Sequence, residues 1–279
     1  YYELGWGGFW FWDPVENASL LPWLTASALM HTIVIAEKKN VFLNWTIILS
    51  LITFSLSLLG TFLVRSGVLV SVHAFASDPT RGIFIILLLI LVSGFGIFLY
   101  LKKINHFVNK NNVYFFSREG AISVNNIFLI SLSFTILVGT IYPIFSSIIF
   151  KSKISVGAPF FNSILTPVMI PLIFGMIIGP FLRWGKDDIY KLALRIKEAL
   201  FFIILVSIVI WYLNYKGPVL SILFFILSSW ICVGSITEII ENVQNNLKLK
   251  KKRFLSSKVF SQSIAHIGIA LVIFGATGT

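Results

Sequence analysis

The residues of this chain that are most able to do chemistry are its four histidines, two of which lie inside long apolar stretches. His31 comes seven residues before Lys38, and His266 comes eight residues after Lys258. An ionisable side chain within an apolar segment is by default a functional candidate. At a rise of about 1.5 Å per residue, both imidazoles would lie roughly 10–12 Å from the nearest basic boundary, on helices of opposite direction.

Two imidazoles at one depth could bind a single metal from opposite sides. Because no cysteine, carboxylate or third histidine is expected near His31 and His266, haem iron is the metal that such a pair would suit. The alternative is that the two histidines are unrelated and hydrogen-bond to the helix backbone or to neighbouring Ser and Thr side chains. The residues alone leave both interpretations open.

A second candidate is the aromatic stretch from Tyr1 to Trp23, YYELGWGGFWFWDPVENASLLPW, which holds half of the eight Trp of the chain. Three glycines disfavour a helix through its first half, and Asp13-Pro14 favours a turn. We therefore expect an irregular aromatic surface, which suits a large flat aromatic ligand. The alternative is an aromatic belt at the membrane interface. The residues expected on this surface are Trp6, Gly7, Gly8, Trp10, Trp12, Asp13 and Trp23.

A third candidate is the segment RSGVLVSVHAFASDPTR, in which His73 lies between Arg65 and Arg81. His73 could be an axial ligand of a haem that lies on the aromatic surface, and the two arginines could bind the haem propionates, since Arg pairs well with carboxylates. The alternative is an ordinary surface histidine in a loop. His106, in the basic sequence KKINHFVNK, is expected to be an ordinary solvated residue.

The composition predicts an all-α protein that crosses a membrane several times. The 279 residues are 57% hydrophobic and only 12% charged, whereas globular chains average about 25% charged residues. The lone Cys232 excludes a disulfide or a CxxC redox pair within the chain. We expect a single transmembrane domain, an internal piece of a longer protein, with prolines that kink the fourth and fifth spans. Eight stretches are long enough to span a bilayer, at roughly 18–37, 41–64, 82–101, 126–150, 164–182, 198–214, 218–240 and 259–278.

The net charge of +11 reflects membrane topology in this interpretation. Of the 22 Lys and Arg, 17 fall in connections on one side of the eight predicted spans, and such an excess marks the inner side. Nucleic-acid binding is therefore disfavoured, and the basic run from Lys248 to Arg253 is expected to face solvent or anionic lipid. The same count places the aromatic stretch and the His73 segment together on the outer side.

The aromatic stretch GWGGFWFWDPVENASLLPW resembles the WWD motif of the haem-handling protein superfamily and, within it, the CcmF family, a cytochrome c haem lyase subunit. The resemblance continues through ALMHTIVIAEKK, SLSLLGTFLVRSGVLVSVHAFASDPTRG and QSIAHIGIALVIFG, with a divergent middle. Two features depart from the family pattern. Phe9 replaces a usual Trp, and the second external histidine, which precedes the motif in the family, is absent here; the chain could be a fragment or a split-gene product.

The resemblance implies a haem site on each side of the membrane. The WWD surface would hold haem delivered by the carrier CcmE, with His73 as one of two external ligands. His31 and His266 would bind a permanent transmembrane haem b, which would reduce the external haem with electrons from quinol. Asp13, Glu3 and Glu16 are expected to bind backbone or orient the loop, because the haem is itself dianionic.

The resemblance also implies a reaction and its partners. The external haem would be attached through its vinyl groups to the thiols of a CxxCH motif in apocytochrome c, presented by CcmH and CcmI. The location would be the bacterial or mitochondrial inner membrane, with the WWD segment on the periplasmic or intermembrane side. Two alternatives are a haem transporter or exporter without this chemistry, and a plain ion or solute transporter.

Overall fold

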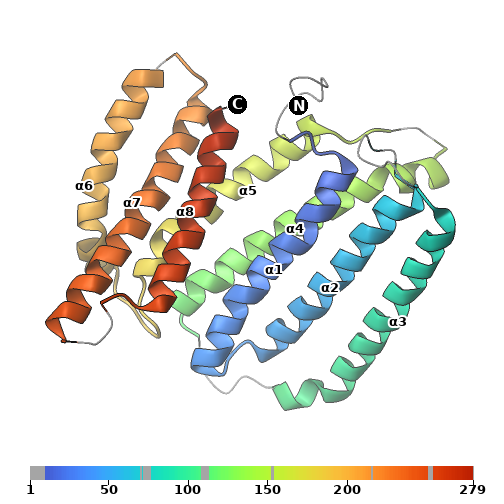
Figure 1. Ribbon diagram of the computed structural model, residues 1–279, viewed down its shortest axis with the longest axis horizontal. Helices are drawn as coiled ribbons and strands as arrows, with labels where there is room; N and C mark the ends of the chain where they lie inside the picture. The colour runs from blue at the N-terminus through green and yellow to red at the C-terminus, as the bar shows by residue number, and fades with distance from the viewer. Residues whose placement is uncertain are drawn as a thin grey trace. The chain divides into compact units, whose positions relative to one another are not determined.

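A computed structural model describes residues 10–69, 71, 77–107, 113–151, 154–214, 216–250 and 254–278 (Figure 1). Within these ranges the chain forms helices and contains no strand. The α-helices are α1 (Pro14–Lys39), α2 (Leu43–Ser66), α3 (Pro79–Lys103), α4 (Arg118–Ile149), α5 (Ala158–Ile178), α6 (Ile189–Asn214), α7 (Val219–Lys248) and α8 (Ser257–Gly278). Two short 3₁₀ helices, η1 (Ile104–Phe107) and η2 (Gly179–Phe181), follow α3 and α5.

The described helices confirm a polytopic membrane protein. Seven of them are long and apolar enough to cross a bilayer, and α6 makes an eighth if its two parts are counted as one span. Those parts, Ile189–Lys197 and Ala199–Leu213, meet at an angle of 56°. Helices suit this environment because each satisfies its own backbone hydrogen bonds where no water is present.

The start of α1 corrects one sequence-based expectation. The first span was expected to begin at about residue 18, after an irregular stretch with a turn at Asp13-Pro14, but the chain is helical from Pro14, and Trp23 of the expected aromatic surface lies within α1. Pro14 is well suited to a first helical position, because the N–H that it lacks would have no partner there. Asp13 caps the helix, and its side chain forms a capping box with Glu16. This Asp-Pro pair therefore begins a helix rather than a loop.

The predicted helix-kinking prolines lie in two settings. Pro143 is inside α4, and Pro167 and Pro171 are inside α5. Pro180 lies beyond the end of α5, in η2.

The chain divides into two compact units, each described here by itself: unit 1 is Tyr1–Val113 with Ile122–Leu172, and unit 2 is Tyr114–Ala121 with Ile173–Thr279. A single transmembrane domain stays a prediction.

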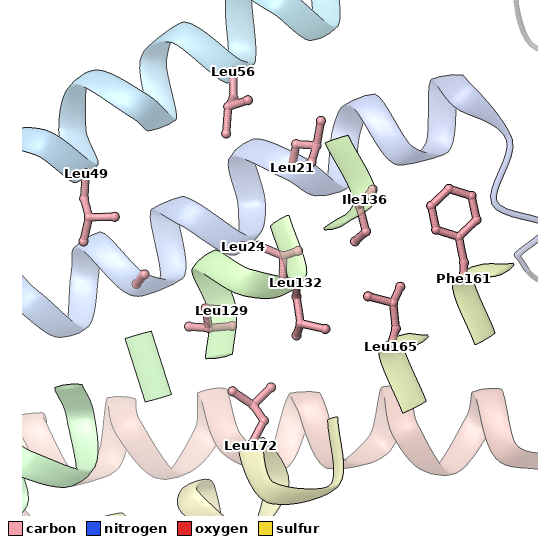
Figure 2. Close-up of a cluster of buried hydrophobic side chains, with 11 residues drawn as sticks. Leu21, Leu24, Leu49, Leu56, Leu129, Leu132, Ile136, Phe161, Leu165 and Leu172 are labelled. Carbon is pink, nitrogen blue, oxygen red and sulfur yellow. The ribbon is translucent and has the colours of Figure 1, made fainter. Parts of the chain in front are cut away.

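Unit 1 has an apolar core to which α1, α2, α4 and α5 all contribute (Figure 2). Its labelled side chains are Leu21, Leu24, Leu49, Leu56, Leu129, Leu132, Ile136, Phe161, Leu165 and Leu172. Close approach of α1 and α2 depends on Gly60, because a Cβ atom there would lie 2.9 Å from the backbone oxygen of Ala18. Small residues at such contacts are typical of helix packing in membranes.

Polar side chains also join α1 to α4 within unit 1. The Asn17 amide nitrogen donates to Thr140 Oγ1 at 3.0 Å, and the Asn126 amide nitrogen donates to Thr32 Oγ1 at 2.8 Å. All four residues are buried. Because apolar packing has little directional preference, these two bonds define the rotation and the relative height of α1 and α4.

In unit 2, α7 and α8 run antiparallel and bury a smaller apolar core (Figure 1). The loop that follows η2 is held by Asp187, whose carboxylate accepts two hydrogen bonds of 2.7 Å from Arg195. Burial alone would raise the pKa of Asp187. Hydrogen bonds from Arg195 and from the backbone N–H groups of Arg183 and Asp188, with the positive charge of Arg195, outweigh that effect and lower the pKa from 3.8 to about 2.

We expect Gly60→Ala to destabilise the protein in detergent, because the added Cβ would overlap the backbone of Ala18. Overpacking of this kind costs about 1–3 kcal/mol, which exceeds the gain of up to about 1 kcal/mol from the better helix propensity of Ala. The matched control is Gly94→Ala in α3, where an added Cβ has no neighbour within 4 Å. Thermal unfolding that ranks the Gly60 variant as the more stable of the two would contradict this packing.

We expect the stabilising effect of Asp187 to depend on pH. Since folding lowers its pKa from 3.8 to about 2, the contribution is complete above the unfolded value and is lost as pH falls toward 2. Asp187→Asn should therefore lower the unfolding temperature at pH 7, and the difference from wild type should shrink between pH 4 and pH 2. Asp188→Asn is the control, because Asn also caps a helix well. A difference that is constant with pH would refute the proposed ion pair.

Candidate functional site

The described part of the aromatic stretch is anchored to α5 by Trp12. The Trp12 ring stacks on the buried ring of Phe161, with centroids 4.9 Å apart and an angle of 21° between planes. The indole nitrogen of Trp12 donates to Asn162 Oδ1 at 2.8 Å. Gly139 in α4 leaves space for this arrangement, because a Cβ there would lie 2.7 Å from the Phe161 ring. The indole is therefore held by both a face contact and a hydrogen bond.

Trp10 extends the aromatic cluster beyond this anchor. Its ring meets Trp12 edge-on, with centroids 6.0 Å apart and an angle of 84°. Phe160 contacts Phe161 in the same manner at 5.2 Å. Edge-to-face contacts of this kind fix ring orientation as well as position. The result is a preformed group of four aromatic rings at the start of α1 and α5, in which Phe161 covers one face of Trp12.

The acidic residues beside the aromatic cluster bind backbone, as expected from the sequence. Glu16 accepts hydrogen bonds from the N–H groups of Phe11 and Asp13, each at 3.1 Å. Asp13 accepts from the N–H of Val15 at 2.9 Å and from the hydroxyl of Ser71 at 2.5 Å. The last contact joins the aromatic stretch to the segment 65–81 from which His73 comes. Asp13 and Glu16 therefore hold the backbone at the start of α1, and Asp13 also links it to the segment 65–81.

Several predicted site residues lie elsewhere or cannot be placed. Trp6, Gly7, Gly8 and His73 lie outside the described residues, as do Glu3 and Phe9. Trp23 is 52% exposed in α1. It follows Asp13 by ten residues, which corresponds to about 15 Å along a helix. The structure therefore separates Trp23 from Trp10 and Trp12 along the axis of α1.

Arg65 and Arg81, the predicted propionate-binding residues, line the same hollow. Its volume is about 470 Å³, and its other lining residues are Thr61, Thr80, Phe84 and Ile85. The two helix ends are tied together, because the backbone N–H of Asp78 donates to the carbonyl of Arg65 at 2.8 Å. Asp78 also pairs with the exposed side chain of Arg81 at 3.2 Å. The hollow thus combines two cationic groups with an apolar wall.

His31 has a geometry that fits a metal ligand. It is half-buried in α1, and its Nδ1 lies 2.7 Å from the carbonyl oxygen of Ser27. Since a carbonyl can only accept, Nδ1 is the donor in this contact, and in the neutral ring the lone pair is then on Nε2. A histidine ligand is typically oriented in this way by a hydrogen bond from its other nitrogen. The donor atom that haem iron would need is therefore present.

His266 is half-buried in α8, four residues after Gln262. It belongs to unit 2, whereas His31 belongs to unit 1. Because each unit is described by itself, the pairing of the two histidines stays a prediction.

The sequence analysis did not identify Phe161, Asn162 and Ser71 as site residues. Their contacts with the aromatic stretch join residues far apart in the chain and leave no local pattern.

We expect the Trp12–Asn162 bond to show as a coupling energy. Trp12→Phe keeps a ring against Phe161 but removes the donor, which should cost about 1 kcal/mol, whereas Trp12→Ala should cost about 3–5 kcal/mol. In a double-mutant cycle with Asn162→Ala, unfolding in detergent should reveal a coupling of about 1 kcal/mol between the two residues. Trp23→Phe is the matched control and should have little effect. Additive losses at Trp12 and Asn162 would argue against the contact.

Comparison with known proteins gives the same relatives by sequence and by structure. The family described as Cytochrome C assembly protein matches residues 1–70. The chain is 42% identical over 280 residues to the cytochrome c-type biogenesis protein CycK of Rhizobium meliloti, covering 99% of this chain and 41% of the relative. It is 39% identical over 276 residues to CcmF of Escherichia coli, covering 99% of this chain and 42% of that protein.

A solved structure described as Cytochrome c Heme Lyase CcmF matches with a TM-score of 0.69 and 22% identity, over 98% of this chain and 40% of that one. At this identity the match supports the fold alone. The chain spans about two fifths of the length of the curated relatives that it matches. The resemblance of this chain to the CcmF family of cytochrome c-type biogenesis proteins is therefore confirmed over 99% of its length.

Proposed function

We propose that this chain is part of a haem lyase component of cytochrome c maturation. In this role it holds haem at its aromatic stretch and promotes thioether attachment to the CxxCH motif of apocytochrome c. The observation that carries the proposal is similarity to cytochrome c-type biogenesis proteins along 99% of the chain. The aromatic stretch lies within the region 1–70 that matches the Cytochrome C assembly protein family.

On the outer side, the chain would position the haem for the reaction rather than supply an acid or a base. Trp10 and Trp12 would contact the flat face or edge of the haem, and His73 would bind its iron. Arg65 and Arg81 would receive the propionates, an assignment supported by the hollow that they share. Holding a vinyl group and a thiolate in reacting geometry is by itself a large part of such catalysis.

Within the membrane, His31 and His266 would be the axial ligands of a haem b. Helix geometry supports this, because each residue lies about two turns from a lysine at the end of a described helix, His31 from Lys38 and His266 from Lys258. The tautomer of His31 supports it as well. A haem held by two histidines has no open coordination position, which suits electron transfer. Such a haem would supply one-electron reduction to the outer site, with quinol as the donor.

The proposed partners follow from the same resemblance. CcmE would deliver the haem, and CcmH with CcmI would present apocytochrome c. The aromatic stretch would face the periplasm or the intermembrane space of a bacterial or mitochondrial inner membrane. The charge asymmetry supports this side, because 17 of the 22 Lys and Arg fall on the opposite side of the predicted spans.

We expect His31→Ala and His266→Ala, made in the full-length protein, each to abolish a stable low-spin b-type spectrum, because one axial ligand is lost. His73→Ala should leave that spectrum intact but stop the maturation of c-type cytochromes, measured by haem staining. His106→Ala is the matched histidine control and should change neither signal. An unaltered spectrum in the His31 or His266 variant would refute the pairing. A His73 variant that matures cytochrome c normally would remove its ligand role.

The same strains separate the lyase from a haem transporter. If the chain promotes attachment, loss of the protein should leave haem bound to its carrier, because delivery continues while the thioether step stops. If the chain only moves haem, the carrier should become depleted of haem instead. Haem staining of the isolated carrier measures this difference, and a depleted carrier would contradict the lyase proposal.

A further inference from the structure

A charged network in unit 2 joins three helices and has no part in the function proposed so far. Arg118 at the start of α4 donates to Gln262 Oε1 at 2.6 Å. Gln262 Nε2 in α8 donates to the two carboxylate oxygens of Glu238 in α7, at 3.1 and 3.3 Å. Arg118 and Glu238 approach to 4.0 Å, with side chains only 20% and 12% exposed. Ionisable groups placed within membrane helices in this way are candidates for function.

The network is also attached to the loop that follows η2. The guanidinium of Arg118 lies over the Trp184 ring, 5.4 Å from its centroid. The neighbouring Glu119 carboxylate accepts the backbone N–H of Gly185 at 3.0 Å. Arg118 is therefore held on two sides, by an aromatic face and by the amide of Gln262. A guanidinium fixed in this manner gives Gln262 a rigid partner.

Gln262 and His266 share one face of α8. The two residues are four apart in α8, so they lie on one face of the helix, one turn from each other. Ala270 and Ile273 continue this face and are buried in the core that α8 shares with α7. The face of α8 that carries His266 is therefore held by a polar contact on one side and an apolar contact on the other.

The antiparallel register places His266 level with small residues of α7. Since Gln262 pairs with Glu238, residues further along α8 lie opposite earlier residues of α7 (Figure 1). His266 is then level with Gly234 and Ser235, both of which are small and buried. Small residues at this level allow α7 and α8 to approach each other closely.

We infer that Gln262, held between Arg118 and Glu238, is a positioning residue that fixes the rotation and depth of α8 so that His266 presents its imidazole to haem iron. The inference rests on the proposed function, in which His266 is an axial ligand. The amide is suited to this task because it must accept from Arg118 and donate to Glu238 at once. Rotation of α8 by one residue, about 100°, would break both bonds.

The test uses the full-length holoprotein in detergent. Gln262→Ala should shift the low-spin electron paramagnetic resonance g values, which report ligand orientation, and should speed haem transfer to apomyoglobin several-fold. A role confined to folding would lower the yield but leave the g values of the folded fraction unchanged. The matched control is Gln244→Ala, at an exposed position of α7, which should change neither measurement.

A residue exchange keeps the test decisive if Gln262→Ala does not fold. Glu238→Gln and Gln262→Glu, combined in one protein, keep one carboxylate and one amide beside Arg118, so the double variant should recover wild-type g values that each single variant lacks. A folded double variant with shifted g values would overturn the inference. If His266→Ala abolishes the spectrum while Gln262→Ala retains wild-type g values, the inference fails and the proposed function stands. If His266→Ala keeps the wild-type spectrum, both fail.

Discussion

The stacking of Trp12 on Phe161 is the interaction on which the aromatic part of the candidate site depends. In a bundle of apolar helices, packing by itself sets few directions, because one aliphatic contact can replace another. The indole of Trp12 adds direction through its ring plane and its bond to Asn162. Asp13 follows immediately, caps α1 and reaches Ser71. Trp12 and Asp13 together thus connect α1 to α5 and to the segment 65–81, which contains His73.

The same principle recurs around each membrane histidine. In α1, His31 is followed by Thr32, whose hydroxyl accepts the amide of Asn126 in α4. In α8, Gln262 lies one turn before His266 and is hydrogen-bonded to both Arg118 and Glu238. Each histidine-bearing helix is therefore fixed by a polar side chain within one turn of its imidazole. Such bonds are modest in energy, about 0.6 kcal/mol on average in one membrane protein, but they choose one rotation among many.

The sequence predicts the parts of this structure that local rules determine. The length of the apolar stretches predicts the helices. The negative charge of Asp13 and Glu16, beside a ligand that is itself dianionic, predicts that they bind backbone. Asp13 is extended, as expected for a residue before proline, but the predicted start of the first helix at about residue 18 was four residues too late, because Pro14 is itself suited to the first position of a helix. Glu16, three residues after Asp13, was the overlooked sign of a capping box.

Long-range contacts could not be predicted from this sequence. Phe161 and Asn162 are about 150 residues from Trp12, and nothing in their local pattern distinguishes them from other residues of an apolar span. Arg118 was counted as one of the basic residues that define the inner side, yet its guanidinium is largely buried against Gln262. The number of Lys and Arg in each connection predicts the topology, because only the total on each side matters. The partner of an individual charge depends on helix packing, which this count does not describe.

The central claim is that the two membrane histidines hold a haem of the b type. A pyridine haemochrome assay of the detergent-purified full-length protein tests this claim most directly, because it identifies the haem and counts it against protein. The account predicts a stably bound b-type haem in a fixed ratio to the protein after extensive washing. Helical, folded protein that carries no haem would contradict it.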